Sequence, residues 1–281
     1  MDARLIQIRE QQKEIWNRYA GGWKKWDEFT MHFLKPMGDS IITALEIRKT
    51  DKVLDIACGT GEPGLTIAGI ANKGSVIGID LSEEMLEVAN EHAISKQIKN
   101  YETKVCDVSE LPFENGSFDK VSCRMGFMFF PDMQLAANEM YRILKTGGKM
   151  ATSVWGVAER NIWVTSVTDV INRNMQLTGP LPGEPSMFRC ASVGVMEGIF
   201  EAAGFLNIKA SELNGVRIYK DFDHLWKMMN DVAAPVVGAM VKANDEMKQK
   251  IKDEVQQLTQ QYQTTEGLAL EFSSLIFSCE K

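Results

Sequence analysis

The 281-residue sequence contains no Lys/Arg-rich run, and 38 acidic residues outnumber 31 basic ones. The net charge of −7 argues against a nucleic-acid partner, because such proteins normally present a basic face. No apolar run is long enough to span a bilayer, and the N-terminus lacks the apolar stretch of a secretory signal. We therefore expect a cytoplasmic protein with no nucleic-acid partner and no integral-membrane segment.

Thiols and imidazoles are also scarce. The five cysteines are scattered without a C-x-x-C pair, and the three histidines (His32, His92 and His224) lie far apart. An odd number of separated thiols fits a reducing compartment better than a disulfide framework. We expect no metal site, and the 44% of hydrophobic residues suffices for one large domain.

The sequence is rich in alternating strand and helix patterns between residues 50 and 155. Strands are expected at 52–57, 75–79, 101–106, 118–123 and 149–155, with helices near 63–70, 82–94 and 133–144. This alternation predicts an α/β fold with a doubly wound, mostly parallel, Rossmann-like sheet. Ligands bind such sheets at the carboxyl ends of the strands, where the strand order reverses. Asp55, Asp80, Asp107 and Arg124 fall at or just past the ends of four successive strands, so we expect them to lie together.

The remaining segments are expected to cover and complete this sheet. Residues before 50 are periodic in the manner of helices, with interruptions at Gly21-Gly22 and at Lys35-Pro36. Beyond residue 155, helices are expected at 161–177, 193–203 and 222–262, the last broken at Pro235, and strands at 205–213 and 268–279. We expect a single domain, 1–281, whose parts are an N-terminal helical lid (1–49), a cofactor-binding core (50–155), a substrate cap (156–190 and 222–266) and the elements that complete a seven-stranded sheet (191–221 and 267–281).

A glycine loop follows the first expected strand. Gly59-Thr-Gly-Glu-Pro-Gly64 matches the G-x-G-x-x-G pattern of dinucleotide-binding enzymes. Gly59 and Gly61 allow a tight turn and a close approach to a ligand. However, the carboxylate of Asp55 would repel a pyrophosphate, whereas it suits a cofactor with a positively charged amino acid tail. Asp80 could accept hydrogen bonds from the ribose hydroxyls of either cofactor, so it does not decide between them.

A second pattern shared with dehydrogenases is weaker. Tyr141 and Lys145 match a Tyr-x-x-x-Lys dyad, but the serine expected about a dozen residues upstream is replaced by the stretch Phe127-Met-Phe-Phe130. Both residues also end an expected helix, where a lysine suits the negative helix terminus. A helix surface and C-terminal cap is therefore the favoured interpretation of this pair.

Five motifs together resemble a known family. They are Val53-Leu-Asp-Ile-Ala-Cys-Gly-Thr-Gly61, Gly78-Ile-Asp-Leu-Ser82, Asp107 followed by Leu111-Pro-Phe, Ser117-Phe-Asp119, and Arg142-Ile-Leu-Lys-Thr-Gly-Gly148. In this combination the sequence resembles the class I methyltransferases that use S-adenosylmethionine, above all the small-molecule enzymes of the ubiquinone/menaquinone type. The resemblance is dense over residues 50–155 and weak elsewhere. Thr146 departs from it, since the family usually has proline there.

The resemblance implies a role for each matching residue. Asp55 and the backbone around Ala57, Gly59 and Gly61 would surround the methionine moiety, and Asp80 would hold the ribose. Leu81 and Met85 would line one side of the adenine and Val108 the other, while Asp107 would accept from its amino group. Cys123 and Arg124 would reach the amino acid tail and the surroundings of the sulfonium. For Leu81, Met85 and Val108 the alternative is ordinary core packing.

Methyl transfer from a sulfonium needs alignment and exclusion of water, and a base only where the nucleophile must lose a proton. His32 and Tyr19 are the candidate bases, although His32 could equally be a solvent-facing histidine and Tyr19 a cover for the cofactor. Trp, Phe and Met residues enrich the expected lid and cap, which favours an apolar small-molecule acceptor such as a quinone precursor, a sterol or a natural-product scaffold. An NAD-dependent oxidoreductase and a non-catalytic cofactor-binding module remain alternatives. The atom methylated and the oligomeric state, a homodimer included, stay open.

Overall fold

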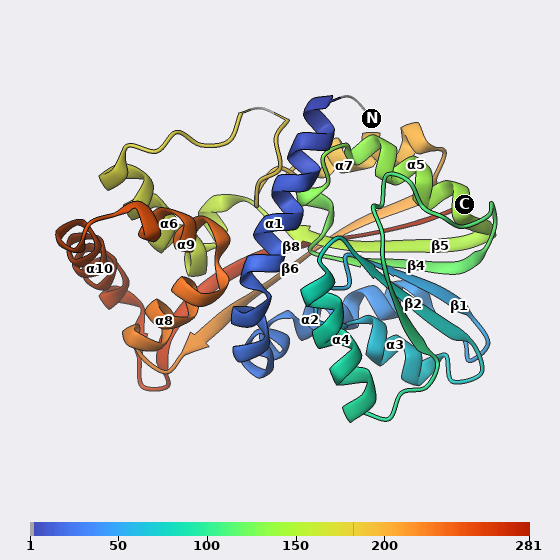
Figure 1. Ribbon diagram of the computed structural model, residues 1–281, viewed down its shortest axis with the longest axis horizontal. Coiled ribbons are helices and arrows are strands. Elements are labelled where there is room, and N and C mark those ends of the chain that lie inside the picture. The colour runs from blue at the N-terminus through green and yellow to red at the C-terminus, as the bar shows by residue number, and fades with distance from the viewer. Residues whose placement is uncertain (1–2, 182) are drawn as a thin grey trace.

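A sheet of eight strands runs through the middle of the computed structural model, which describes residues 3–181 and 183–281 (Figure 1). The strands are β1 (Lys52–Ile56), β2 (Ser75–Asp80), β3 (Tyr101–Val105), β4 (Phe118–Arg124), β5 (Leu144–Trp155), β6 (Leu206–Tyr219), β7 (Gln263–Thr264) and β8 (Gly267–Glu280). Seven of them follow the order β3-β2-β1-β4-β5-β8-β6, and the two-residue β7 pairs with β8. Strand β8 runs antiparallel to both neighbours, whereas the pairs from β3 to β5 are parallel. The predicted fold class is therefore confirmed.

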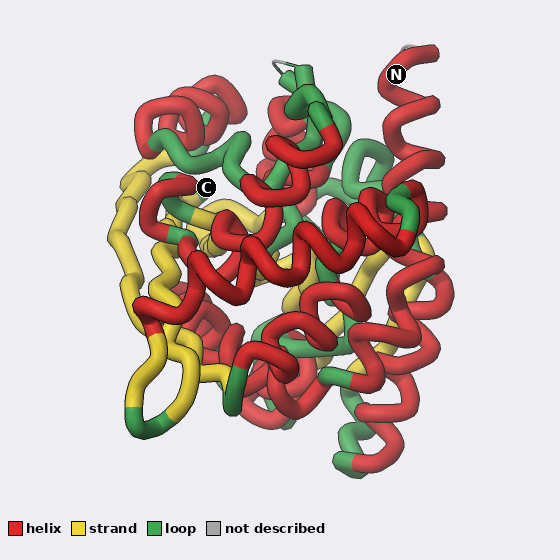
Figure 2. The backbone as a smooth tube through the Cα atoms, turned by 90° about the vertical axis from the view of Figure 1, so that its left-hand side faces the viewer, coloured by secondary structure: helices red, strands yellow, loops and turns green. Residues whose placement is uncertain are grey.

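Helices cover both faces of the sheet. They are α1 (Ala3–Lys25), α2 (Asp27–Leu45), α3 (Gly64–Ile70), α4 (Glu83–Ser95), α5 (Met133–Ile143), α6 (Ile162–Met175), α7 (Val193–Ala203), α8 (Phe222–Val232), α9 (Ala234–Lys242) and α10 (Asp245–Thr259), with short 3₁₀ turns at Phe127–Phe129, Ala158–Arg160 and Gln260–Tyr262. In Figure 1, α2, α3 and α4 lie below the sheet and α5 and α7 above it. Helices α6, α8, α9 and α10 gather beside it, and Figure 2 views the molecule from that side.

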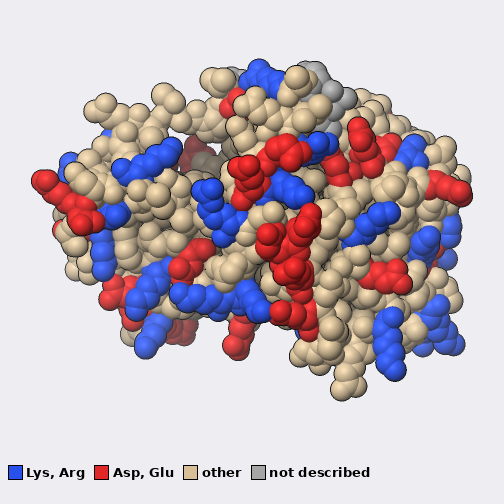
Figure 3. Space-filling view, viewed as in Figure 1, with Lys and Arg blue, Asp and Glu red and all other residues tan. Residues whose placement is uncertain are grey.

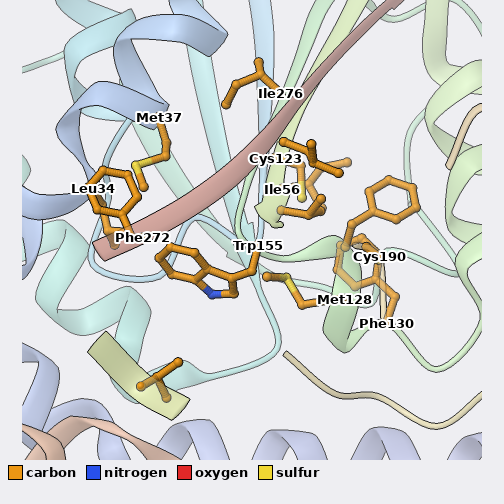
Figure 4. Close-up of a cluster of buried hydrophobic side chains, with 14 of the residues drawn as sticks. Leu34, Met37, Ile56, Cys123, Met128, Phe130, Trp155, Cys190, Phe272 and Ile276 are labelled. Atoms are coloured by element: carbon orange, nitrogen blue, oxygen red, sulfur yellow. The ribbon is translucent and has the colours of Figure 1, made fainter. Parts of the chain in front are cut away.

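The main core joins the sheet to these outer helices. Its buried side chains come from α2, from the central strands and from β8, and Figure 4 shows several of them, including Leu34, Met37, Trp155 and Phe272. The ring of Phe33 stacks on Trp155 at 5.8 Å between centroids and meets Phe272 edge-on at 5.0 Å. Helix α2 is thereby fixed against the carboxyl end of β5.

Two predicted helix breaks near the N-terminus are wrong. Helix α1 continues through Gly21 and Gly22, and α2 continues through Pro36; the chain turns instead at Trp26. A glycine at position 22 is needed for the contact between α1 and α8, because a Cβ there would lie 1.9 Å from the backbone oxygen of Asp231 in α8. Met1 and Asp2 of the expected lid lie outside the described residues, as does Pro182 of the expected cap.

Beyond residue 155, the helices and strands expected from the sequence are present, but their first and last residues differ from those expected. Strand β6 extends to Tyr219, well past the expected 213, because it pairs with β8 along its length. The expected helix 222–262 is three helices, and Pro235 lies in the first turn of α9, where a proline costs no hydrogen bond. Within the described ranges, no helix combines the length and apolar character needed to cross a bilayer.

Candidate active site

A cleft of about 130 Å³ lies where the strand order reverses. Strands β2 and β4 flank β1 on opposite sides, so the chain leaves the sheet toward opposite faces at the carboxyl ends of β1 and β4. The cleft is lined there by the glycine loop, by residues following β2, β3 and β4, and by side chains of α1 and α2. The position of the cleft is the one predicted from the strand pattern.

The two glycines of the loop serve different needs. Gly59 lines the cleft with a φ of +52°, and a Cβ there would meet no atom within 4 Å. Gly61 has a φ of +110° and faces the protein, where a Cβ would lie 2.7 Å from Leu65 Cδ1. Ala57 also lines the cleft in the left-handed region, with a φ of +53°. Gly59 leaves room for a ligand, whereas Gly61 permits the turn and the packing of α3.

Asp55 lies beneath the loop and is not among the lining residues. Its Oδ1 accepts a 2.6 Å hydrogen bond from Ser122 Oγ, and its Oδ2 accepts one of 3.0 Å from the backbone N–H of Gly64. Burial raises the pKa of this carboxyl to about 7, opposed by the Ser122 hydrogen bond and by the charge of Arg124. Asp55 therefore fixes the start of α3 against β4, and its contact with a cofactor stays a prediction.

Asp80 and Asp107 both line the cleft. Asp80 accepts backbone hydrogen bonds from Gly59 (3.0 Å) and Ser82 (2.9 Å), one on each carboxylate oxygen, and burial raises its pKa. Asp107 accepts from the N–H of Ser109 at 2.8 Å, and its other oxygen lies 3.2 Å from Nη1 of Arg9 in α1. Each carboxylate is thus held in a fixed orientation at the end of its strand.

The other predicted cofactor residues also include some that line the cleft and one that lies behind it. Leu81, Met85 and Val108 line the cleft, as does Arg124, whereas Cys123 lies buried behind it. Burial lowers the pKa of Arg124, whose Nη2 lies 3.2 Å from Met31 Sδ.

The two candidate bases are not brought to this cleft. Tyr19 is buried in α1, and His32 is exposed on α2 beside a second hollow that it shares with Lys35 and Asp39. Neither is a lining residue of the main cleft. The predicted catalytic role of each stays untested by this placement.

Several lining residues were not assigned to the site from the sequence. Trp16 and Trp23 of α1, Met31 and Leu34 of α2, and Phe129 and Phe130 after β4 form an apolar wall. The ring of Trp16 meets that of Phe129 edge-on, with 5.1 Å between the centroids. The same ring meets that of Trp23 edge-on, with 6.3 Å between the centroids. The tryptophans stood out in composition, but only the docking of α1 over the strand ends shows that they face the cleft.

A polar network that the sequence did not reveal ties the loop to two helices. Thr60 Oγ1 donates to Asp27 Oδ1 at 3.0 Å, joining the loop to the start of α2. His92 Nδ1 of α4 lies 2.9 Å from the carbonyl oxygen of Thr60, and its Nε2 lies 3.7 Å from Asp27 Oδ2. The carbonyl can only accept, so Nδ1 is the donor, and the three residues together hold the loop in place.

The Tyr-x-x-x-Lys pair lies away from the cleft. Lys145 Nζ bonds Asp119 Oδ1 at 2.7 Å, and the ring of Tyr141 packs edge-on against Phe205 at 5.2 Å. Neither side chain lines the cleft. Among the residues with described positions, no group of three or more His, Cys, Asp or Glu could hold a metal ion.

Comparison with known proteins agrees with this geometry. Residues 47–192 match the model of a methyltransferase domain family. The chain is 30% identical over 185 residues to the demethylmenaquinone methyltransferase of Staphylococcus aureus, which covers 62% of this chain and 76% of that enzyme. The solved YcgJ protein of Bacillus subtilis has a TM-score of 0.57 at 23% identity, covering 89% of this chain and 98% of that one. Phosphoethanolamine N-methyltransferase 2 of Haemonchus contortus, solved with S-adenosyl-L-methionine, gives 0.54 at 21% identity, covering 88% of this chain and 52% of that one.

The two structural likenesses show the fold, while the domain match and the Staphylococcus aureus relative show the family. This chain belongs to the methyltransferase domain family. It is a class I enzyme that uses S-adenosylmethionine, as the motifs predicted.

Proposed function

We propose that this enzyme transfers the methyl group of S-adenosylmethionine to a small, flat and largely apolar acceptor of the quinol type. The observation that supports this proposal is that the cleft has one polar side and one apolar side. The glycine loop, Asp80 and Asp107 make a polar side at the ends of β1, β2 and β3, while Trp16, Trp23 and the other residues of the apolar wall cover the β4 side. The relative named for demethylmenaquinone supports a quinone-derived acceptor.

The residues present suit S-adenosylmethionine better than a dinucleotide. Within 3–181 and 183–281, the charged residues that line the cleft are Glu62, Asp80, Asp107 and Arg124, which is three acids against one base. This balance attracts a cationic sulfonium and opposes a pyrophosphate. The open space beside Gly59 gives the backbone the close approach that such a ligand requires.

The predicted cofactor residues that line the cleft keep their proposed roles within this arrangement. Asp80 would hold the ribose and Asp107 the adenine amino group, with Leu81, Met85 and Val108 against the adenine faces. Ala57, Gly59 and Arg124 would contact the methionine moiety. Asp55, Gly61 and Cys123 would act from behind by fixing the loop and the end of β4.

The N-terminal segment 1–49 would be the lid and segments 156–190 and 222–266 the substrate cap. Helix α1 lies across the strand ends, and the ion pairs that hold it include Arg9–Asp107, Lys13–Glu83 and Lys24–Glu91. Figure 3 shows acidic side chains gathered on this central face of the molecule. A cleft of 130 Å³ is smaller than the roughly 300–1,000 Å³ of typical ligand pockets, so α1 would move when ligands enter.

The bound cofactor supplies a methyl group on a sulfonium, which leaves as a neutral thioether. The chain would contribute alignment and exclusion of water, since Trp16, Trp23 and Phe129 close the cleft from the α1 side. His32 and Tyr19 remain the proposed bases for an acceptor that must lose a proton, and each would need α1 or α2 to shift to reach the cleft.

Calorimetry with the Asp80→Asn variant tests the cofactor site. Removing the charge should weaken S-adenosylhomocysteine binding by about 1.5–3 kcal/mol, roughly 10- to 150-fold, and NAD should bind neither protein. Asp119→Asn is the matched control, because Asp119 also accepts a backbone hydrogen bond, from Lys52, but lies near the start of β4, at the end of the sheet away from the cleft. Undiminished affinity in Asp80→Asn at unchanged thermal stability would remove Asp80 from the site.

Transfer of label from tritiated S-adenosylmethionine tests the acceptor class. We expect labelled product with 1,4-naphthoquinol and none with phosphoethanolamine. Transfer to phosphoethanolamine alone would overturn the apolar acceptor while leaving the methyltransferase activity intact.

A further inference from the structure

Arg217 of β6 is a buried cation that has no anionic partner among the residues of known position. The residue is 4% exposed, and its Nε and Nη2 atoms are buried without a hydrogen-bond partner among the described residues. Several other arginines pair with carboxylates, as Arg142 does with Glu139 and Arg173 with Glu254, whereas Arg189 donates to the backbone carbonyl oxygens of Phe130 and Pro131. Burial lowers the pKa of Arg217, yet an arginine stays charged in proteins. An unpaired charge in this position is costly to the fold.

Four aromatic rings surround the guanidinium. Its central carbon lies 4.1 Å from the ring centroid of Phe33, 4.5 Å from that of Phe29, 5.1 Å from that of Tyr219 and 5.5 Å from that of Trp163. These cation–π contacts offset part of the cost of burial, but they accept none of the N–H groups in the guanidinium plane.

A second donor lies beside the first. The hydroxyl of Tyr219 is buried and also lacks a described partner, and burial raises the pKa of this phenol to about 12, so it keeps its proton. The nearby His224 cannot serve as the missing acceptor for Arg217 through Nδ1, because that nitrogen accepts the backbone N–H of Lys220 at 3.2 Å. The cluster therefore holds an excess of donors, which an oxyanion would satisfy.

This cluster adjoins the cleft through α2 and β5. Phe33 contacts Arg217, and the next residue, Leu34, lines the cleft. Trp155 at the end of β5 packs on both Phe33 and Trp163, and Figure 4 shows it in one cluster with Leu34 and with Phe130, another lining residue. An acceptor with one end at the cleft could reach the guanidinium once these rings turn aside.

We infer that Arg217 and Tyr219 form an anion-recognition site for the methyl acceptor, which is an aromatic molecule carrying a carboxylate. The guanidinium fork matches the planar, two-oxygen geometry of a carboxylate, and the surrounding rings match a flat scaffold. This inference rests on the proposed function, since it names the chemical class of the acceptor.

The test compares two probes that differ in charge, 2-naphthoate and naphthalene-2-methanol, on the protein saturated with S-adenosylhomocysteine. We expect calorimetry to show at least tenfold tighter binding of the carboxylate to the wild type, with a matching rise in its melting temperature. Arg217→Met should lose this preference while melting no lower than the wild type, because an unpaired buried charge has been removed. Tyr219→Phe should reduce naphthoate binding several-fold, and Arg173→Met in the cap helix α6 should change nothing.

Equal binding or no binding of the two probes to the wild type would overturn the inference, and so would a preference that survives in Arg217→Met. A folding failure of Arg217→Met would indicate a guanidinium held structurally by the rings, and the wild-type and Tyr219→Phe comparisons would still decide the site. If the wild type fails to bind S-adenosylhomocysteine, the proposed function itself is wrong. Normal cofactor binding without a carboxylate preference refutes only the anion site.

Discussion

Gly21 and Gly22 offer a test of how helix α1 is docked. Both glycines lie inside α1, so replacing either with alanine removes the same backbone freedom from the unfolded chain. A Cβ on Gly21 would meet no atom within 4 Å, whereas one on Gly22 would lie 1.9 Å from Asp231 O and 2.8 Å from Asp231 C. The pair therefore separates helix propensity from helix docking at adjacent positions.

Gly21→Ala should stabilise the protein by about 1 kcal/mol, the difference in helix propensity between the two residues. For a chain of this size, that gain raises the melting temperature by about 2–4 °C. Gly22→Ala gains the same propensity but forces two backbones apart. Tight contact begins at 3.4 Å, so α1 would retreat from α8 by about 1.5 Å. Overpacking typically costs 1–3 kcal/mol, which leaves a net loss of up to about 2 kcal/mol.

That retreat would also reach the cleft. Trp26 Nε1 and Lys25 Nζ both donate to Asp231 Oδ2, at 2.7 and 2.6 Å, and Trp23 on the same turn lines the cleft. Calorimetric melting, S-adenosylhomocysteine titration and limited proteolysis of α1 should therefore all distinguish the variants, with Gly22→Ala melting lower, binding more weakly and being cut faster. If both variants shift stability in the same direction, or if Gly22→Ala binds cofactor as the wild type does, the docking of α1 onto α8 is not as described.

Two further substitutions probe the glycine loop. Gly59→Ala should cost about 1–2 kcal/mol for its left-handed backbone and weaken S-adenosylhomocysteine binding at least tenfold, because the new methyl group enters the cleft; affinity unchanged in calorimetry would exclude the loop from the ligand site. Asp55→Asn should raise the free energy of unfolding at pH 8 by at most about 4 kcal/mol and change it little at pH 4.5. The folded-state pKa of about 7 lies above the ordinary 3.8, so the folded protein holds a proton that the unfolded chain releases between about pH 4 and 7, and wild-type stability falls as pH rises through that window. Equal effects of Asp55→Asn on thermal unfolding at the two pH values would contradict this assignment.

The sheet and the polar side of the cleft follow closely from the sequence, because local patterns determine both. Parallel strands buried on both faces appear as short apolar runs, and their carboxyl ends meet at one edge of the sheet. Asp80 and Asp107 could therefore be placed together from their positions in the chain alone. The hydrogen bond that fixes Asp55 could not be found in this way, since its partner Ser122 comes from β4, 67 residues away.

The Gly21-Gly22 pair in α1 shows why glycines in a sequence do not always mark a break in a helix. A glycine lowers helix propensity whatever its surroundings, and the sequence reports only that cost. At Gly22 the missing side chain is what allows α8 to approach. The glycine therefore destabilises α1 as an isolated helix but stabilises the packing of α1 against α8. Propensity is a weak guide wherever a tertiary contact outweighs about 1 kcal/mol per residue.

The proposed acceptor side differs from the cofactor side, because its residues come from distant parts of the chain. Arg217 comes from β6, Phe33 from α2 and Trp163 from α6. In the sequence, Arg217 alternates with Val216 and Ile218 like any charged residue on a half-exposed edge strand, and nothing nearby indicates burial. The outward positions are instead the apolar ones, with Val216 52% and Ile218 42% exposed. This reversal places a charge inside and valine and isoleucine outside, against the preference that burial imposes on stability alone. Such an inversion is retained where the charge serves a purpose other than folding, which is why it supports a recognition role for Arg217.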